Sequence, residues 1–367
     1  MAGSMFDQIL RVNMKKKSAS PWTVPTDLKP YIGGMGYGTK ILIDEVPPAC
    51  DPLSSDNKIV LTVGPLTGTA APMHAQSCMV TKSPLTGTIL NSYAGGFVGA
   101  EMKFCGIDGL IFEDIADEWT LILVENDQVS FHDGSPVAGK NTSETEQYMR
   151  NRFGRDVHTI SIGKAGENLV SMASVFSETR TFGRGGAGAV MGSKNLKAVS
   201  CRGTTGTQVG DPMAFMQATG ACNQILADNP VTGEGLPTYG TQVLMNVINE
   251  TGALPTRNHT EVQFEGANNI SAEAMAEPRE SDGKPNLVRN QACFGCTIAC
   301  GRVSTVERTH YTVKDRPQYH GASGGLEYEA AWALGAATGV DDLDALTFAN
   351  FICNEQGFDP ISFGATV

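Results

Sequence analysis

Three cysteines near the end of the sequence have the spacing of metal ligands: Cys293-Phe-Gly-Cys296-Thr-Ile-Ala-Cys300. A two-residue gap lets a turn place two sulfurs side by side, and a three-residue gap matches one helical turn. Iron–sulfur clusters require thiolate ligands, and zinc accepts them as well. Either metal needs a fourth ligand, which Cys353 supplies if its helix folds back and which otherwise lies beyond residue 367. The alternative interpretation is three buried cysteines without a metal.

A glycine-rich stretch at residues 182–197 is the second candidate site. Glycines let backbone N–H groups approach an anion closely, and Arg184, Lys194 and Lys197 would add positive charge. The spacing of the glycines is that of neither a Walker loop nor a dinucleotide-binding fingerprint. Turn glycines with a purely structural role are the alternative interpretation.

The tetrapeptide Pro-Leu-Thr-Gly occurs twice, ending at Gly68 and at Gly87. This repeat predicts paired turns that line one surface. His74 follows the first copy and is the one histidine that we single out, although a structural role is its simpler interpretation.

Two carboxylates, Glu327 and Glu329, flank Tyr328 and precede Trp332. A carboxyl group beside aromatic rings can have a raised pKa and can transfer protons. The simpler interpretation is a solvated acidic start of a helix, where negative charge favours the helix dipole.

These candidates need structural elements to position them, and patterns typical of strands dominate the first two hundred residues. We predict strands at Gln8–Asn13, Lys58–Val63, Gly109–Glu113, Trp119–Glu125, Gln128–His132, His158–Gly163 and Leu196–Ser200. Helical spacing of apolar residues predicts helices at Thr39–Glu45, Asp211–Ala227, Thr241–Asn249, Leu326–Ala337 and Asp341–Gln356. We therefore expect an α+β fold, with a β-rich domain at residues 1–205 and a mainly α-helical domain at residues 210–367.

The composition excludes several classes of function. The 367 residues include 27 Lys and Arg against 39 Asp and Glu, and this net charge of −12 argues against nucleic-acid binding. No apolar run approaches the roughly 18 residues of a membrane span, and the first residues lack the basic and apolar regions typical of a signal peptide. A long acidic chain without a signal pattern predicts a cytoplasmic protein, and in that compartment disulfides are rare, so the clustered members of its nine cysteines indicate metal or redox chemistry. The last eleven residues open a new segment, which predicts that this chain is part of a longer protein.

Together these segments resemble the aldehyde ferredoxin oxidoreductase family, whose members carry tungsten or molybdenum on two pyranopterins. The resemblance covers nearly the whole chain and rests on an ordered set of motifs: Gly33-Gly-Met-Gly36, Gly64-Pro-Leu-Thr-Gly68, Ser83-Pro-Leu-Thr-Gly87, Lys103-Phe-Cys-Gly106, Gly163-Lys-Ala-Gly-Glu167, Gly188–Lys197, Leu254–Asn258, Cys293–Cys300 and Glu327-Tyr-Glu329. It implies a first domain of two β-sheets that form the base for the pterins, followed by helical domains. Family members are longer, in agreement with the expected continuation.

The resemblance also implies which residues hold the cofactors. Cys293, Cys296 and Cys300 match three of the four ligands of a 4Fe-4S cluster. Glu329 and Glu327 are the catalytic candidates, with Glu329 as the acidic residue that carries protons near the metal. The residues implied in cofactor binding are Gln76, Tyr93, Gly95, Gly96, Arg184, Gly185, Gly186, Asn354 and Asp359. Magnesium is a further expected cofactor.

Several positions depart from the family pattern. Asn354 replaces the aspartate that usually begins the first of two pterin motifs, and the second motif, which brings the last cluster cysteine, is absent. Gln76 stands where an arginine is common between pterin and cluster, and Tyr93 stands where an asparagine is common. Phe348 occupies the place of the glutamate that helps some members to build a bridging iron site.

The function implied by the resemblance is the two-electron oxidation of an aldehyde to a carboxylic acid. Electrons would pass through the pterin and the cluster to ferredoxin or to a dedicated iron–sulfur subunit, and the chain could form a homodimer. Gln76 and Tyr93 also raise a reductive alternative, in which an acyl-CoA or aromatic acyl-CoA is reduced. A non-catalytic metal-binding fragment with one zinc on the three cysteines is the third hypothesis.

Overall fold

The computed structural model describes residues 4–367, and these form two compact units. The first unit contains the chain up to Gly220 together with Cys293–Cys296 and Glu355–Phe358. The second unit contains the remaining residues. The metal-ligand motif is therefore divided, because Cys293 and Cys296 belong to the first unit and Cys300 to the second.

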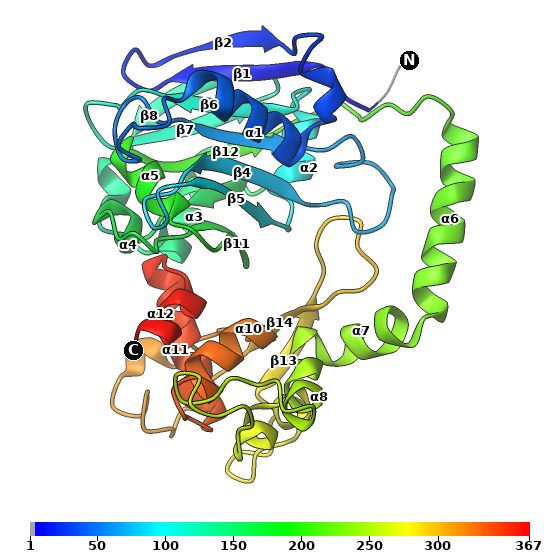
Figure 1. The fold of residues 1–367 in the computed structure, drawn as a ribbon, viewed down its shortest axis with the longest axis vertical. Coiled ribbons are helices and arrows are strands. Elements are labelled where there is room, and N and C mark those ends of the chain that lie inside the picture. Colours follow the sequence, from blue (N-terminus) through cyan, green and yellow to red (C-terminus); the bar gives the residue numbers. More distant parts are fainter. Residues whose placement is uncertain (1–3) are drawn as a thin grey trace. The chain divides into compact units, whose positions relative to one another are not determined.

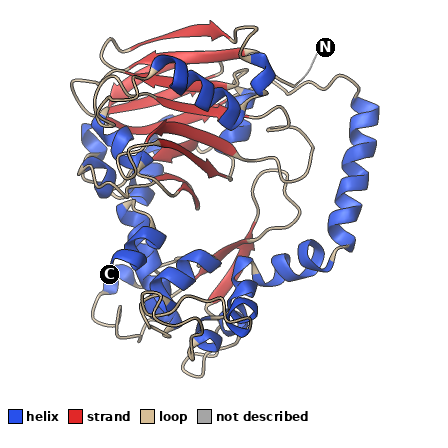
Figure 2. Ribbon diagram, in the orientation of Figure 1, coloured by secondary structure: helices blue, strands red, loops and turns tan. Residues whose placement is uncertain are grey.

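Two six-stranded mixed sheets make up most of the first unit (Figures 1 and 2). The first sheet has the order β2-β1-β6-β3-β4-β5, with β1 Gln8–Asn13, β2 Ser18–Thr23, β3 Ile59–Val63, β4 Ser77–Lys82, β5 Ile89–Ala94 and β6 Gly109–Glu113. The second has the order β11-β10-β9-β12-β7-β8, with β7 Thr120–Glu125, β8 Gln128–Asp133, β9 His158–Ser161, β10 Val175–Ser177, β11 Arg180–Phe182 and β12 Leu196–Arg202. Each sheet contains one parallel pair, β1 with β6 and β7 with β12, and the other pairs are antiparallel.

Apolar side chains from both sheets share one core, which explains why their strands are buried. That core includes Leu61 of β3, Leu110 of β6 and Val199 of β12. The first unit also contains the helices α1 Gly34–Glu45, α2 Val98–Phe104, α3 Thr142–Phe153 and α5 Ala187–Ser193. A short α4, Lys164–Glu167, packs on α5. Helices α1 and α3 bury apolar side chains in two smaller clusters, one with each sheet.

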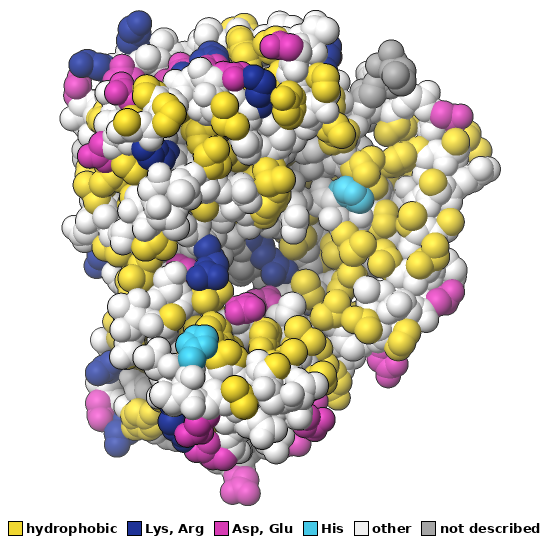
Figure 3. All heavy atoms as spheres, in the orientation of Figure 1, with side chains coloured by type: hydrophobic (Ala, Val, Ile, Leu, Met, Phe, Trp, Pro, Cys, Tyr) yellow, Lys and Arg dark blue, Asp and Glu magenta, His cyan; other side chains and the backbone are white. Residues whose placement is uncertain are grey.

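The second unit is mainly helical, with one short two-stranded sheet. Its elements are α7 Leu236–Tyr239, α8 Leu244–Glu250, α9 Ala272–Ala276, β13 Leu287–Gln291, β14 Gly301–Ser304, α10 Tyr328–Ala331, α11 Leu343–Gln356 and α12 Pro360–Thr366. A π-helical turn, Trp332–Ala336, continues α10. Helix α6, Pro212–Asp228, leaves apolar side chains such as Met213 and Ile225 exposed. Figure 3 shows hydrophobic side chains on the visible surface of this helix.

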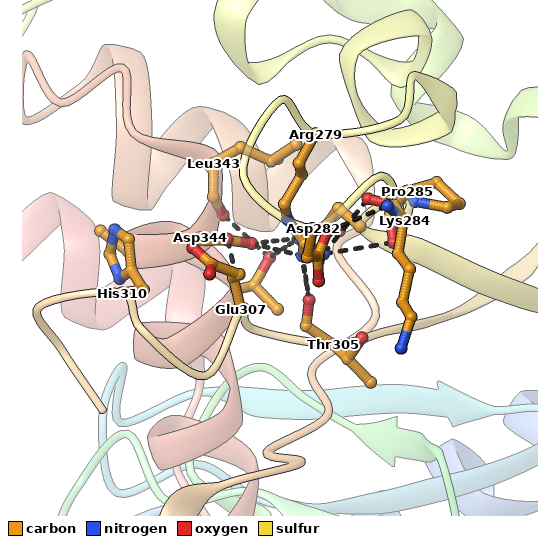
Figure 4. A network of polar contacts seen from close by, with 12 residues as sticks. Arg279, Asp282, Lys284, Pro285, Thr305, Glu307, His310, Leu343 and Asp344 are labelled. Carbon is orange, nitrogen blue, oxygen red and sulfur yellow. Dashed lines mark hydrogen bonds and ion pairs between the residues drawn. The ribbon is translucent and has the colours of Figure 1, made fainter. Parts of the chain in front are cut away.

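A polar network fixes the start of α11 within the second unit (Figure 4). Asp344 accepts hydrogen bonds at 2.8 Å from both the Arg279 guanidinium and the Asn286 amide. Arg279 also donates to the carbonyl of Thr305. Because Asp344 is almost fully enclosed, its charge depends on these donors.

The α+β class and the order of a two-sheet part before a helical part are confirmed. The strands predicted at Gln8–Asn13 and Gly109–Glu113 have the predicted bounds, and the predicted hairpin partners became β7 and β8. The helix predicted from Thr39 begins earlier, at Gly34, because its glycines pack closely without breaking it. The domain division at residues 1–205 and 210–367 stays a prediction.

The expectation that the two Pro-Leu-Thr-Gly turns line one surface is wrong. The turn ending at Gly68 follows β3 beside the start of β4, whereas the turn ending at Gly87 follows the end of β4. The two turns thus lie at opposite ends of one six-residue strand, about 17–20 Å apart at the usual rise. Within residues 4–367, no helix has both the length and the apolar character that crossing a membrane requires.

Candidate functional site

The turn Gly95-Gly96-Phe97 leaves the end of β5 and is the centre of the candidate site in the first unit. Strands β4 and β5 pair Ser77 with Ala94 as their last pair, so Gln76, directly before β4, and Gly95, directly after β5, both lie next to this pair. The Gln76 side chain is exposed. Two of the predicted cofactor residues, Gly95 and Gly96, therefore meet a third, Gln76, at one corner of the sheet.

The cysteine loop lies directly on this turn. A β-carbon added to Gly95 would lie 2.6 Å from Sγ of Cys293, so only glycine leaves room for the sulfur. The backbone N–H of Phe294 donates a 3.0 Å hydrogen bond to the carbonyl of Gly96. The Phe294 ring also meets the Phe104 ring of α2 edge-on, with centroids 5.7 Å apart. These contacts hold the first cysteine against the end of β5.

The chemistry of the three thiols fits an iron–sulfur cluster. Cys293, Cys296 and Cys300 are partly exposed and form no disulfide, and the N–H of Cys296 donates to the Cys293 carbonyl at 3.2 Å. This turn places the first two cysteines next to each other, and soft thiolates are the donors that iron–sulfur clusters use. Among the described residues, no three His, Cys, Asp or Glu side chains converge closely enough to hold a metal ion. The ligand role of the three cysteines stays a prediction.

Cys353 has an environment that argues against its use as the fourth ligand. Its side chain is buried in α11, and burial raises its pKa to about 12, with a further contribution from Asp359. Metals bind the thiolate, which this environment disfavours.

A hairpin tip from the second sheet contacts the double-glycine turn. Strands β10 and β11 pair Ser177 with Arg180, and the Cγ of Arg180 lies 3.6 Å from the place where a Gly96 β-carbon would be. The hydroxyl of Ser177 lies at the same distance from that place. This hydroxyl is buried and has no hydrogen-bond partner within the described residues. An unsatisfied buried hydroxyl beside Gly96 fits a site that is completed by a polar group.

Tyr93, another predicted cofactor residue, lies on β5 with 43% of its surface exposed. It pairs across the strands with Cys78, whose thiol is buried. Burial raises the pKa of Cys78 to about 11 despite a hydrogen bond with Tyr93.

The glycine-rich stretch at residues 182–197 has a mainly structural explanation. A β-carbon at Gly185 would collide with Leu90, one at Gly186 with the carbonyl of Ser171, and one at Gly188 with the carbonyl of Ser174 at 2.5 Å. These glycines let α5 and the segment before it pack closely. Arg184 is exposed. The cofactor role of Arg184, Gly185 and Gly186 stays a prediction.

The prediction that Lys194 and Lys197 supply charge for an anion is wrong. Both side chains are fully buried. The Lys194 amine donates to the carbonyl of Asn57 at 2.6 Å, and the Lys197 amine donates to Glu167 at 2.5 Å. Burial lowers the pKa of Lys194 to about 8. Both amines serve the core of the first unit, because buried carbonyl and carboxylate oxygens need donors.

The segment around Gly357 is part of the first unit and packs against its backbone. A β-carbon at Gly357 would lie 2.6 Å from the backbone nitrogen of Gly163, and the Gly357 carbonyl accepts a hydrogen bond from the N–H of Ser174 at 2.9 Å. In the second unit, Asp359 caps α12 by accepting from the N–H of Ile361 at 2.9 Å. Asp359 is buried, whereas Asn354 is half-buried in α11.

The two glutamates at α10 differ in their surroundings. Glu327 precedes the helix and accepts a hydrogen bond from the Thr241 hydroxyl, which in turn accepts from the N–H of Tyr328 at 3.1 Å. Glu329 lies in the first turn with an exposed side chain. Burial raises the pKa of Tyr328, and the neighbouring charge of Glu329 raises it further. Glu329 is thus the more exposed of the two glutamates, and the catalytic role of both stays a prediction.

Phe348 lies in an aromatic cluster with Tyr319 and Phe351, at centroid distances of 5.3 and 6.2 Å. The place where some family members have an iron-binding glutamate is therefore filled here by an aromatic side chain that packs against other rings. Sequence reasoning missed Ser177 and Arg180, because strands of three residues leave little pattern.

A two-sheet part that seats a cysteine loop, followed by a mainly helical part, is also the architecture of a solved oxidoreductase complex. The active-site complex BamBC of benzoyl coenzyme A reductase, solved with 1,5-dienoyl-CoA, superposes with a TM-score of 0.82 at 27% identity. The structural match covers 100% of this chain and 55% of the chain in the complex.

The family models identify the chain. The N-terminal domain of aldehyde ferredoxin oxidoreductase matches residues 9–203, and domains 2 and 3 of the same enzyme match residues 217–367. The chain belongs to the aldehyde ferredoxin oxidoreductase family.

Curated relatives agree with this assignment. The tungsten-containing aldehyde ferredoxin oxidoreductases of Pyrococcus horikoshii and Pyrococcus furiosus are 42% and 40% identical over 98% of this chain. An aliphatic sulfonate oxidoreductase, WOR-like subunit, of Pyrococcus furiosus is 25% identical over 97%. The chain spans 57% of the length of each of these relatives.

Proposed function

We propose that the chain belongs to a tungsten- or molybdenum-pterin oxidoreductase that oxidises an aldehyde to a carboxylic acid. Its electrons would pass through a 4Fe-4S cluster to ferredoxin or to an iron–sulfur subunit. The observation that carries the proposal is the seat of the cysteine loop, with Cys293 against Gly95 and Phe294 bonded to Gly96. The tungsten-containing relatives support the same class of enzyme.

When bound, the metal on its pterins would supply the two-electron chemistry that turns an aldehyde and water into a carboxylic acid, two protons and two electrons. The thiols of Cys293, Cys296 and Cys300 would hold the cluster. The absence of side chains at Gly95 and Gly96 lets the Cys293 sulfur and the stem of Arg180 lie close to the end of β5. The exposed Gln76 and Tyr93 of the same corner would orient the cofactor.

Proton movement would fall to Glu329. Its carboxylate is exposed at the first turn of α10, where it can take up a proton and release it to water. The hydrogen bond from the Thr241 hydroxyl would keep the Glu327 carboxylate in its position. The proposal includes pterin contacts by Arg184, Asn354 and Asp359, and magnesium as a further cofactor. It also includes a cytoplasmic location and the division into two domains.

Metal analysis of the chain purified without oxygen tests the proposal. We expect iron together with tungsten or molybdenum, and a spin-resonance signal after reduction with dithionite. A single zinc without iron or released pterin would instead support the non-catalytic metal-binding fragment.

A second candidate is the reduction of an acyl-CoA. It is favoured by the similarity to the benzoyl coenzyme A reductase complex over the whole chain and by the exposed Tyr93 beside the site. Oxidation of aldehydes with a viologen acceptor, compared with reduction of aromatic acyl-CoA by reduced viologen, distinguishes the two directions.

A further inference from the structure

Arg302 is the second residue of β14 and follows Cys300 by two positions. Only 5% of its surface is exposed, so its guanidinium depends on hydrogen-bond acceptors within the protein. Its Nη1 donates to the carbonyl of Gly301 at 3.1 Å and, more weakly, to the carbonyl of Ala299 at 3.4 Å. These two residues directly precede and follow Cys300, so one side chain holds the backbone on both sides of the thiol.

The backbone at Cys300 has a shape that needs such support. Ala299 has a positive φ of 51°, a conformation that costs free energy for a residue with a β-carbon. Gly301 begins β14 and pairs with Gln291 of β13. The chain therefore passes from a left-handed turn into a strand at Cys300, and the donors of Arg302 stabilise this turn.

The guanidinium of Arg302 is itself held in place. Nη1 also donates to the side-chain oxygen of Asn290, the directly opposite residue of β13, at 2.6 Å, and Nη2 donates to the carbonyl of Leu236 at 2.7 Å. The guanidinium plane lies against Gly240, because a β-carbon there would be 2.6 Å from Nε and 2.8 Å from both Cζ and Nη2. Any larger residue at Gly240 would therefore push the guanidinium away.

The residue after Gly240 holds one of the candidate glutamates. The Thr241 hydroxyl donates to Glu327 and accepts a hydrogen bond from the N–H of Tyr328 at 3.1 Å. Because Arg302 lies against Gly240, it contacts the backbone that carries this hydroxyl. The same guanidinium thus contacts the turn of the cysteine and the segment that holds the glutamate, and all of these residues belong to the second unit.

We propose that Arg302 is a positioning residue that fixes Cys300 as a cluster ligand and, through Gly240 and Thr241, keeps the Glu327 carboxylate at the start of α10. Cys300 is a ligand only if the proposed function holds, and this part of the role rests on it, whereas the contacts of Arg302 do not. Lysine cannot take over the role, since only a guanidinium offers several donors in one rigid plane.

The first test needs no cluster. Labelling with iodoacetamide, followed by fragmentation of the labelled peptide in mass spectrometry, gives the alkylation rate of Cys300 relative to that of Cys296. We expect Arg302→Lys to raise this ratio about fivefold, because the turn opens more often once its carbonyls lose their donors. Lysine keeps the positive charge, so the change reports the geometry of the turn.

Arg279→Lys is the matched control. Arg279 is a mostly buried guanidinium of the same unit, and its acceptors include the Thr305 carbonyl and Asp344 rather than the cysteine turn (Figure 4). Its replacement by lysine therefore loosens the second unit by a comparable loss of donors. We expect it to leave the alkylation ratio unchanged.

Hydrogen exchange at the Tyr328 amide tests the link to the glutamate. This N–H donates to Thr241, so we expect Arg302→Lys to speed its exchange about fivefold and Arg279→Lys to leave it unchanged. Asn290→Ala removes an acceptor of the guanidinium at an exposed position and should raise the alkylation ratio and the exchange rate about twofold. This milder variant decides the question if thermal unfolding shows that Arg302→Lys does not fold.

The third test uses the chain reconstituted with iron and sulfide without oxygen. We expect Arg302→Lys to reduce the spin-resonance signal of the reduced cluster about threefold or more, and Arg279→Lys to retain it. An undiminished signal in Arg302→Lys would overturn the role of Arg302 in holding the cluster ligand.

The other outcomes separate the role of Arg302 from the proposed function. An unchanged Cys300 ratio in Arg302→Lys and Asn290→Ala overturns the positioning of the cysteine, and so do equal effects of Arg302→Lys and Arg279→Lys. Unchanged exchange at Tyr328 overturns the link to the glutamate. A chain that takes up no iron, but whose Cys300 ratio and Tyr328 exchange rise in Arg302→Lys, refutes the proposed function and supports the positioning by Arg302.

Discussion

Replacing Gly95 by alanine should release the cysteine loop from its seat. The added β-carbon would lie 2.6 Å from the Cys293 sulfur, whereas ordinary van der Waals contact begins at 3.4 Å. The sulfur must therefore move by at least 0.8 Å, the difference between these distances. Metal ligands need placement within about 0.5 Å, so we expect iron binding to weaken about tenfold or more.

The fold itself should tolerate this substitution. The clashing atom is the end of a short side chain that can rotate away, and Gly95, unlike Gly96, does not have a positive φ. We therefore expect the free energy of unfolding to change by less than about 1 kcal/mol. Gly64→Ala is the matched control, because a β-carbon there would meet nothing within 4 Å.

Iron per chain after reconstitution, and the alkylation rate of Cys293, measure the effect. Gly95→Ala should bind less iron and change the Cys293 rate, while Gly64→Ala should resemble the unmodified chain. Wild-type iron content together with an unchanged Cys293 rate in Gly95→Ala would refute the seat of the loop as the basis of cluster binding.

Three other substitutions test the packing that supports the site. Asp344→Ala should cost about 3 kcal/mol in urea unfolding, because it removes the 2.8 Å carboxylate partner of Arg279 in Figure 4 and leaves this charge only the 3.9 Å ion pair with Asp282, and a loss below about 1 kcal/mol would contradict this. Burial raises the pKa of Glu355, so its charged form disfavours folding once the pH exceeds that pKa. Glu355→Gln should therefore raise the melting temperature at pH 7 but not at pH 4, and equal shifts at both values would refute the reasoning. Burial lowers the pKa of Lys194 from 10.5 to about 8, so its cost to folding is full below pH 8 and disappears towards pH 10.5. Relative to Lys194→Met, the unmodified chain should gain up to about 3 kcal/mol of stability over that interval in chemical denaturation, whereas a difference independent of pH would count against the buried amine.

The sequence alone predicted what depends on neighbouring residues. Apolar runs such as Gly109–Glu113 indicated strands because each residue of a buried strand is covered by the core, and the cysteine spacing indicated soft-metal chemistry. The order of a β-rich part before a helical part followed from the change of apolar periodicity.

Only the tertiary structure decided which distant residues meet. From the sequence, Lys194 was predicted to bind an anion. In the structure its amine donates a hydrogen bond to the buried carbonyl of Asn57, which is far away in the sequence. Cys293 lies on Gly95, and Arg180 reaches the same glycine from a three-residue strand. Such contacts depend on how the sheets and loops pack, and packing joins residues whose separation along the chain carries no local pattern.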